Sequence, residues 1–362
     1  MKELERVYLY WFAFHAYISN EKKRELLEIG VSPEQLYQMK HGERKQYFSS
    51  QEEERFVRSC TLEKTKQEME WASRNHVRIV FWTEEEYPTK LKKIYDYPLG
   101  LFIKGKLPDE KFLSIAMVGA RDITPYGMQA ADYFSSQLAR RGVQIISGLA
   151  RGVDGYSHKG ALKANGYTLG VLGCGIDLQY PKSNCYLYDQ MEQKGGIISE
   201  FPPGTPPIAR NFPKRNRIIS GISDGVFVLE AKERSGSLIT ADLALEQGRD
   251  VFALSGRYYD DMSKGCLELI QKGAKLVYKP ENIIEEFSFA REIHTNFTNV
   301  KKISLANKEK LVYDCLRLEP KYVDYIVSEC QLPVSEVLTI LTMLEVKQYI
   351  IQEQKNYYRI KE

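Results

Sequence analysis

The sequence predicts an α/β fold in which helices cover both faces of a doubly wound, mostly parallel sheet. From about residue 83, short apolar runs alternate with amphipathic stretches of helical length, and most runs end in a glycine-containing turn. This alternation is typical of βαβ units, whose crossover helices cover a parallel sheet. The runs that we predict as strands are Leu99–Lys104, Ser114–Val118, Val143–Ser147, Thr168–Leu172, Gly196–Ser199, Gly225–Leu229, Asp250–Leu254 and Lys275–Tyr278.

Residues 1–82 are predicted to form a helical module ahead of this sheet. Aromatic and aliphatic residues recur at helical spacing in Val7–Ile18 and Leu26–Leu36, between charged stretches. The Ser-Pro pair at 32–33 is typical of a helix start. The apolar run from Tyr8 to Ile18 is too short for a membrane span and His15 interrupts it, so we expect a buried helix.

A polar stretch at 288–307 is predicted to link the sheet domain, 83–287, to a small domain at 308–362. In the small domain we expect three helices and a hairpin, namely Lys308–Leu318, Tyr322–Cys330, Ser335–Val346, and the strands Tyr349–Glu353 and Tyr357–Ile360. Three helices followed by a two-stranded wing are the pattern of a winged-helix domain.

The third helix of this small domain lacks the charges of a DNA-reading helix. Glu336 and Glu345 lie near its ends, and no Lys or Arg precedes Lys347. Helices that read the major groove present polar or basic side chains to base edges. We therefore predict a protein–protein or intersubunit role for residues 308–362.

Composition excludes several classes of protein. A net charge of only +3 over 362 residues excludes a histone-like polycation, so any nucleic-acid site must be a local patch. The six cysteines form no C-x-x-C pair and have no histidine at zinc-ligand spacing, which suits a reducing cytosol. The first residues do not resemble a signal peptide. We expect a cytoplasmic protein without a membrane partner.

Several loops that follow predicted strands combine glycine with Arg or Ser. In an open parallel sheet, ligands bind beyond the carboxyl ends of the strands, near the point where strand order reverses. Glycine lets backbone amides approach an anion, a helix N-terminus adds a favourable dipole, and Arg forms paired hydrogen bonds to phosphate. The candidate phosphate-binding residues in these loops are Gly119, Arg121, Ser147, Gly148, Arg151, Gly152, Gly173, Gly175, Gly236 and Ser237.

The segment 210–221 interleaves basic residues with an aromatic one. Lys214 and Arg215 follow Phe212 closely. A groove for a single strand of nucleic acid needs cations for the backbone and a flat ring for a base. We expect Arg217 to have a structural role, because neighbours on one helix cannot all face one ligand.

Motifs of several enzyme classes are absent. The sequence has no G-x-G-x-x-G followed by an acidic residue at dinucleotide spacing, no P-loop, no G-x-S-x-G and no H-E-x-x-H. Asp154 and His158 could share a helix face, but without a third ligand nearby a structural hydrogen bond is the favoured interpretation over a metal pair. We expect no catalytic residue, no cofactor and no metal.

In these loops the sequence resembles the DprA/Smf family, DNA-processing protein A. The segments that carry the resemblance are VGARDITPYG (118–127), SGLARGVDGYSH (147–158), LGCGIDLQYPKSN (172–184), ISEFPPG (198–204), FPKRNRIISGIS (212–223) and SGSLITADLALEQGRDVFA (235–253). They follow one another through the whole central domain. The C-terminal winged helix matches as well.

The resemblance implies a Rossmann-like core that binds DNA without catalysis. It implies that the protein binds single-stranded DNA during natural transformation, protects it, helps to load the RecA recombinase, and forms a homodimer. The family's phosphate-pocket motif falls on Gly119 and Arg121. Its basic–aromatic motif falls on Phe212, Lys214, Arg215 and Asn216.

The chain departs from the family pattern at a few positions. Ala120 stands where the family usually has Ser, Ser255 where it has Pro, and Leu267 where it has Asn. The N-terminal module, similar to a SAM or helix-hairpin-helix module, lacks the paired glycines through which the latter contacts DNA.

Two alternative functions stay open. One is a nucleotide hydrolase of the lysine-decarboxylase-like class, whose active loops would combine Arg151, Gly236 and Glu246. The other is a module that senses a small nucleotide.

Overall fold

The structure is a computed structural model that describes residues 3–287, 307–316, 320–347 and 349–360. The chain divides into two compact units, residues 1–296 and 297–362. The predicted linker, 288–307, lies outside the described residues except for residue 307, where a helix begins.

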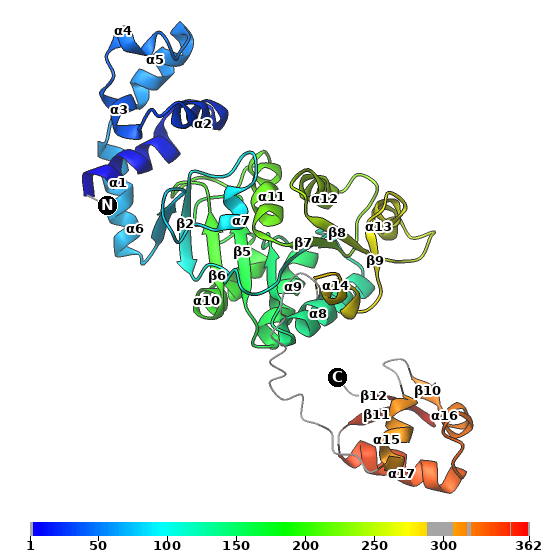
Figure 1. Cartoon of the computed structure of the whole chain (residues 1–362). Helices are drawn as coiled ribbons and strands as arrows, with labels where there is room; N and C mark the ends of the chain where they lie inside the picture. The colour runs from blue at the N-terminus through cyan, green and yellow to red at the C-terminus, as the bar shows by residue number, and fades with distance from the viewer. Residues whose placement is uncertain (1–2, 288–306, 317–319, 348, 361–362) are drawn as a thin grey trace. The chain divides into compact units, whose positions relative to one another are not determined.

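The first unit is built around a nine-stranded sheet with the order β1-β2-β6-β5-β4-β3-β7-β8-β9 (Figure 1). The strands are β1 Arg78–Phe81, β2 Gly100–Gly105, β3 Ser114–Val118, β4 Gln144–Ser147, β5 Thr168–Leu172, β6 Gly196–Ser199, β7 Gly225–Val228, β8 Asp250–Leu254 and β9 Lys275–Val277. The seven strands from β6 to β9 in this order are parallel, whereas β1 and β2 are antiparallel to their neighbours. The predicted doubly wound, mostly parallel sheet is confirmed.

Strand order reverses between β3 and β7. From β3 the chain continues through β4, β5 and β6 on one side, and then returns to build β7, β8 and β9 on the other side. Val118 pairs with Val228, so the loops after β3 and β7 leave the sheet at the same level. This is the switch point at which open α/β sheets bind ligands.

One strand was not predicted. Residues Arg78–Phe81 lie in the stretch that we expected to be helical, but they form β1, which pairs with β2 from Arg78↔Ile103 to Phe81↔Gly100. The helical expectation for these residues is wrong. Four residues after a long helix are too few to show their own periodicity, and pairing with β2 decides their conformation.

Helices cover both faces of the sheet. On one face α8 (Pro125–Arg140), α9 (Val153–Lys163) and α14 (Glu281–Phe287) pack over Ile115 and Met117 of β3. On the other, α11 (Asn211–Ile222), α12 (Gly236–Glu246) and α13 (Asp261–Gln271) pack with Ala116 and Val118 (Figure 1). The alternation along β3 follows from the two-residue repeat of a strand. The remaining helices of this region are α7 Thr89–Lys92, η2 Lys182–Asn184 and α10 Cys185–Lys194.

The N-terminal helices are α1 Glu3–Tyr10, η1 Trp11–His15, α2 Asn20–Glu28, α3 Pro33–Gln38, α4 His41–Arg44, α5 Ser50–Ser59 and α6 Glu63–Arg74. The expected buried helix over Tyr8–Ile18 is buried at Tyr10, Trp11 and Phe12, but from Trp11 it widens into a π-helical turn that ends at His15. Ser32 caps α3 in a capping box with Pro33 at its first position, as predicted.

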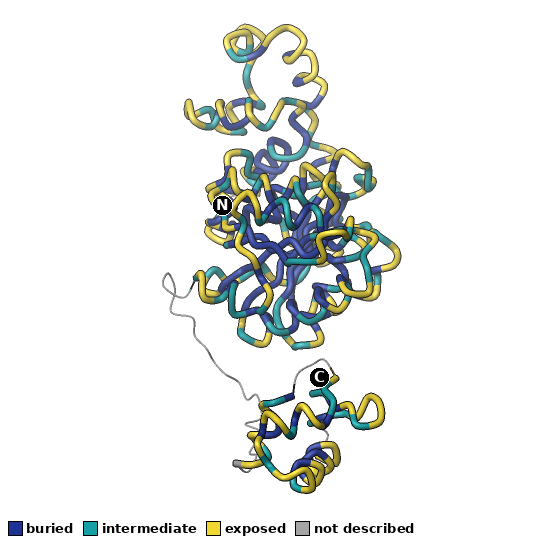
Figure 2. The backbone as a smooth tube through the Cα atoms, turned by 90° about the vertical axis from the view of Figure 1, so that its right-hand side faces the viewer, coloured by how far each residue is buried: buried dark blue, intermediate teal, exposed yellow. Residues whose placement is uncertain are grey.

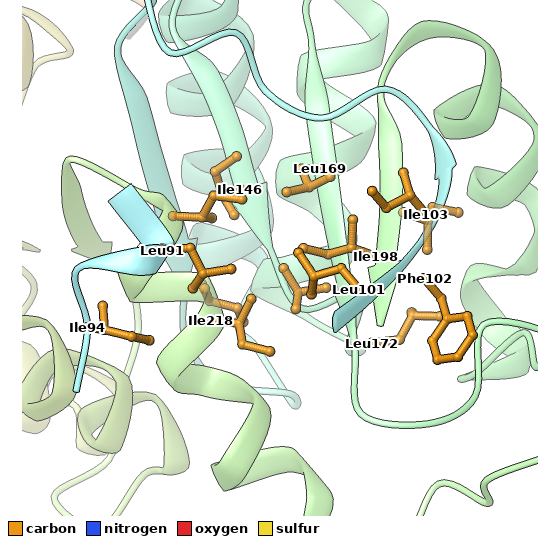
Figure 3. Close-up of a cluster of buried hydrophobic side chains, with 14 of the residues drawn as sticks. Leu91, Ile94, Leu101, Phe102, Ile103, Ile146, Leu169, Leu172, Ile198 and Ile218 are labelled. Atoms are coloured by element: carbon orange, nitrogen blue, oxygen red, sulfur yellow. The ribbon is translucent and has the colours of Figure 1, made fainter. Parts of the chain in front are cut away.

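These helices share one hydrophobic core with the sheet. The ring centroids of Phe14 and Phe102 are 4.6 Å apart, and those of Phe12 and Trp82 are 6.0 Å apart. Figure 3 shows the adjoining part of this core, where Leu101 and Ile198 lie among aliphatic side chains. Figure 2 shows buried residues concentrated in the interior of the first unit and exposed residues on its outer turns. The module boundary that we placed at residue 82 stays a prediction.

The second unit contains α15 Asn307–Asp314, β10 Lys321–Tyr322, α16 Val323–Cys330, α17 Val334–Val346, β11 Ile350–Gln354 and β12 Tyr357–Ile360. As predicted, three helices precede a hairpin, and the short strand β10 adds a third strand beside β12. Val337, Ile340, Leu341 and Leu344 of α17 are buried in its core, whereas Leu338 is exposed.

Among the described residues no single helix has the length and apolar composition of a membrane span, although α16 and α17, bent by 111°, meet these criteria as a pair.

Candidate functional site

A cleft of ≈ 640 Å³ opens at the switch point between β3 and β7. Its walls come from the loop after β3, the loop between β7 and α12, and the first turns of α11 and α12. Gly119 and Arg121 line it from the first loop, and Gly236 and Ser237 line it from the start of α12. Phe212, Arg215 and Asn216 line it from α11, so the structure brings seven of the predicted residues together at the predicted place.

Gly119 and Gly152 hold the loops of this cleft in contact. A Cβ on Gly119 would lie 2.9 Å from the carbonyl oxygen of Glu230, to which the Ala120 amide donates a hydrogen bond at 2.8 Å. Gly152 has a φ of +77°, and a Cβ there would lie 2.2 Å from the Ala120 carbonyl oxygen. The two glycines allow this close approach of backbones, and Arg121 projects from the resulting turn with an exposed side chain.

The Asp154 carboxylate forms hydrogen bonds with backbone amides of the loop after β4, which we expected to face a phosphate. Its carboxylate accepts hydrogen bonds from the amides of Gly148 (3.1 Å) and Ala150 (3.3 Å). Burial raises the pKa of Asp154, while Arg215 and these amides act in the opposite direction. Ser147 is fully buried and donates to the Met117 carbonyl oxygen at 2.6 Å. We therefore remove Ser147 and the Gly148 amide from the candidate interface.

Arg215 belongs to the scaffold of the cleft. Its side chain is buried and donates hydrogen bonds to the carbonyl oxygens of Gly148, at 2.7 Å, and Val171. Burial lowers its pKa to about 10, despite the nearby Asp154 carboxylate. Arg215 lines the cleft floor as a fixed cation, and not as the free phosphate ligand that we predicted.

Phe212 supports Arg121. The Arg121 guanidinium carbon lies 5.3 Å from the centroid of the Phe212 ring, a cation–π geometry. Gly173 leaves room for the ring, because a Cβ on it would lie 2.8 Å from the Phe212 Cδ1 atom. Phe212 is half-buried, so it offers a base less ring surface than we expected.

Tyr180 is the more accessible aromatic residue of the site. Its ring centroid is 5.7 Å from that of Phe212, and 41% of the residue is exposed. It also lines a smaller adjoining cavity of ≈ 120 Å³ together with Arg151 and Gly173. Sequence reasoning missed Tyr180, although an aromatic residue in the loop after 168–172 was a usable signal.

Two cations of the cleft were also missed. Lys232 and Arg234 are exposed on the loop between β7 and α12, and both line the cleft. The acidic groups at its wall are Asp122, which lies 3.5 Å from Arg151, and the buried Asp154. The described side chains thus give the cleft a surplus of positive charge within a nearly neutral chain.

Two predicted residues, Gly175 and Lys214, do not line the cleft. The Gly175 amide donates to the Thr205 carbonyl oxygen at 2.9 Å, so it is not free for a ligand. Lys214 is exposed but is not among the residues that line the cleft, whereas Asn216 is. Burial lowers the pKa of Lys23 in α2 to about 7, and the Lys214 charge acts less strongly in the same direction.

Arg217 has the structural role that we predicted. It is 6% exposed, donates to Asp96 at 3.1 Å and pairs with Glu200. Asp96 also accepts a hydrogen bond from Arg24 of α2 at 2.7 Å. This bridge fixes α11, and with it Phe212, against the N-terminal helices.

The structure does not assemble a metal or hydrolase site from the candidate residues. His158 is buried with its Nδ1 atom 2.6 Å from the Thr168 hydroxyl oxygen, and the part of the chain that the structure describes holds no group of three or more His, Cys, Asp or Glu able to bind a metal. Gly236 and Glu246 lie at opposite ends of α12, roughly 15 Å apart at 1.5 Å per residue. The trio of the hydrolase alternative is therefore not brought together.

Comparisons with known proteins agree on one family. The family model described as DNA recombination-mediator protein A matches residues 78–288, and the DprA winged helix domain matches residues 300–354. Protein Smf of Escherichia coli K12 is 40% identical over 299 residues, which cover 80% of this chain and 79% of that protein. The DNA processing protein DprA of Bacillus subtilis is 47% identical over 205 residues, which cover 56% of this chain and 69% of that protein.

Two solved structures are similar as well. The X-ray structure of DNA processing protein A from Streptococcus pneumoniae has a TM-score of 0.69 at 35% identity, and the match covers 77% of this chain and 97% of that one. A structure of DNA processing protein A from Helicobacter pylori, which concerns the unique single-stranded DNA binding mode of that protein, has a TM-score of 0.53 at 30% identity. That match covers 59% of this chain and 97% of that one.

Proposed function

The chain belongs to the DNA recombination-mediator protein A family, and from this premise we propose that its switch-point cleft binds single-stranded DNA. The observation that carries the proposal is the convergence of Arg121, Lys232 and Arg234 on one cleft beside the exposed ring of Tyr180. The Helicobacter pylori structure, which concerns single-stranded DNA binding by a relative, supports the same ligand.

The chemistry of the cleft suits a single strand better than a duplex. Cations at its rim attract phosphates, and a base can stack on Tyr180 because every base has a flat face. In a duplex those faces are covered by neighbouring bases. Sequence preference should be slight, since stacking does not read hydrogen-bonding groups.

We further propose that the protein acts without catalysis, as a cytoplasmic homodimer. In this view it protects single-stranded DNA from nucleases and helps to load the RecA recombinase during natural transformation. The separation of Gly236 from Glu246 supports a binding role over nucleotide hydrolysis.

A binding titration tests the proposal directly. Fluorescence anisotropy with a labelled oligothymidylate and a duplex of equal length, over a series of salt concentrations, should give tighter binding to the single strand. The log–log salt slope should be about −0.7 per phosphate neutralised, with roughly three to five phosphates per subunit. Salt-independent binding or a preference for the duplex contradicts the proposal.

Separate assays address the finer roles. Nuclease digestion of a bound oligonucleotide measures protection, and the lag before RecA filament growth on single-stranded DNA measures loading. Incubation with nucleoside monophosphates should release no free base. Release of base would support the hydrolase alternative.

A further inference from the structure

The carboxyl ends of five adjacent strands carry the cations and rings of the site. In the sheet order β5-β4-β3-β7-β8, the loops after the first four strands supply in turn Tyr180, Arg151, Arg121, and the pair Lys232 and Arg234. The fifth loop, between β8 and α13, contains Arg257, Tyr258 and Tyr259. Because these strands are parallel and in register, all five loops lie along one edge of the sheet.

Two tyrosines of the fifth loop face solvent. Tyr258 is 83% exposed and Tyr259 is 63% exposed, and their ring centroids are 5.2 Å apart with the rings nearly perpendicular at 88°. The hydroxyl of Tyr259 lies 3.3 Å from Nη1 of Arg257. Rings so exposed add little to the core of the protein, whereas they offer flat faces to a base.

This loop is anchored to the wall of the cleft. Asp260 caps α13 by accepting from the Met262 amide at 3.1 Å, and the Met262 carbonyl oxygen accepts from the Ala231 amide at 2.8 Å. Met262 lines the cleft, and Ala231 precedes Lys232. Tyr259 is three residues before Met262, so its backbone lies within about 10 Å of the cleft wall.

We propose that Tyr258 and Tyr259 form a second stacking site for single-stranded DNA, which receives bases beyond the switch-point cleft. The inference rests on the proposed function. Adjacent strands are about 4.8 Å apart, so four steps from β5 to β8 span roughly 19 Å. A strand with 3.4 Å per nucleotide spans that length in about six nucleotides, and an extended strand in fewer.

The charges around this loop indicate that it binds by stacking more than by phosphate attraction. Asp261 pairs with Lys264 at 2.7 Å, and Asp260 is occupied as a helix cap. Residues 257–261 carry one cation, Arg257, against the two carboxylates of Asp260 and Asp261, and the Arg257 guanidinium lies beside the Tyr259 hydroxyl. The contribution of the loop to affinity should therefore change little with salt, in contrast to that of Arg121.

Oligonucleotides of two lengths distinguish binding at the loop between β8 and α13 from binding at the cleft. For the double variant Tyr258→Ala/Tyr259→Ala, we expect about tenfold weaker binding of a twelve-nucleotide oligothymidylate, equal to about 1.4 kcal/mol. Binding of a four-nucleotide oligomer at low salt should stay within about twofold of wild type. Arg121→Ala should weaken both, and the loss in the tyrosine variant should be equal at low and high salt.

Two control variants test whether the aromatic rings at positions 258 and 259 are responsible for the loss of affinity. Tyr258→Phe/Tyr259→Phe keeps the rings and should retain wild-type affinity, and Tyr325→Ala, an equally exposed tyrosine of the second unit, should have no effect. Photocrosslinking of an oligomer with 5-iodouracil at one end should label residues 258–259. If the double alanine variant binds the long oligomer with unchanged affinity, or loses affinity equally for both lengths, the proposed stacking site is wrong. Binding of both oligomers by the wild type would still support the cleft in that case. Failure of the wild type to bind either oligomer overturns both.

Discussion

The guanidinium of Arg215 occupies the space that any side chain at Gly148 would need. A Cβ on Gly148 would lie 2.5 Å from Nη2 of Arg215, and Nη1 donates to the Gly148 carbonyl oxygen at 2.7 Å. The pair joins the start of α11 to the loop after β4. The glycine that we predicted for an amide–phosphate contact is thus required for the packing of an arginine.

Arg215→Ala is expected to destabilise the protein. It removes charged hydrogen bonds to two carbonyl oxygens and the positive charge that favours the buried Asp154 carboxylate, which together cost about 3 kcal/mol of the free energy of unfolding. Urea denaturation measures this change. The neighbouring variant Lys214→Ala, an exposed position, should stay within about 0.5 kcal/mol of wild type. Equal stability of the two variants would show that Arg215 is not part of the scaffold.

Arg121→Ala should weaken single-strand binding without affecting the fold. Arg121 is exposed, and its cation–π contact with Phe212 contributes only about 0.5–1 kcal/mol to stability. We expect the salt slope of binding to fall by about 0.7 in magnitude, corresponding to one phosphate contact. Arg58→Ala, an exposed arginine on α5 that pairs with Glu54 four residues before it, is the matched control and should bind as wild type. If Arg121→Ala binds single-stranded DNA with unaltered affinity and salt slope, the cleft is not the DNA-binding site.

Stability should fall in acid partly because of His158. Burial lowers its pKa to about 3, whereas an unfolded histidine has a pKa near 6.5. Between these values the unfolded state takes up a proton that the folded state excludes, so the free energy of unfolding falls by up to about 1.4 kcal/mol per pH unit as pH decreases. The Thr168 hydroxyl donates to the Ile145 carbonyl oxygen, so Nδ1 of His158 must donate to Thr168.

Urea denaturation of wild type and His158→Gln between pH 7 and pH 5 measures this contribution. The variant should lose less stability across this range. Asp154, whose pKa is raised, has the opposite sign and is common to both proteins, so it cancels in the difference. Parallel pH profiles of the two proteins would rule out His158 as the source, and His158→Asn serves if the glutamine variant does not fold.

Removal of residues 308–362 should leave single-strand affinity within about threefold, under about 0.7 kcal/mol. The first unit has its own core and contains every residue of the cleft. Helix α17 carries Glu336 and Glu345 toward its ends and exposes Leu338 and Val346, a surface better suited to a protein partner than to phosphates. A loss of tenfold or more in a folded truncated protein would show a direct DNA contact in the second unit.

The sequence was sufficient for the sheet and for the location of the site. Strands such as Ser114–Val118 and Thr168–Leu172 were predicted with their exact bounds, because buried parallel strands are short apolar runs that end in glycine turns. Because those turns follow the strands directly, they also predicted a cleft at the carboxyl ends of the strands. In contrast, β1 is too short to be separated from the helix before it.

The roles of single residues within the site could not be predicted. Lys214 and Arg215 are consecutive on α11, so their side chains differ in direction by about 100°, and only the packing around them shows which one turns inward. Lys232 and Arg234 were missed because Glu233 between them makes the run look like an ordinary solvated turn. The use of the Gly148 amide by Asp154 depends on a loop conformation that spacing alone does not reveal.

The core shared by the N-terminal helices and the sheet has a practical consequence for how the protein can be trimmed. The region that matches the recombination-mediator family begins at residue 78, at the first residue of the edge strand β1. A chain cut there would lose Phe12 and Phe14 and leave Trp82 and Phe102 without the rings that cover them. A bare apolar face beside an unprotected strand edge promotes aggregation through pairing with another chain. The N-terminal helices therefore protect this end of the sheet from self-association, and a shortened protein should keep them.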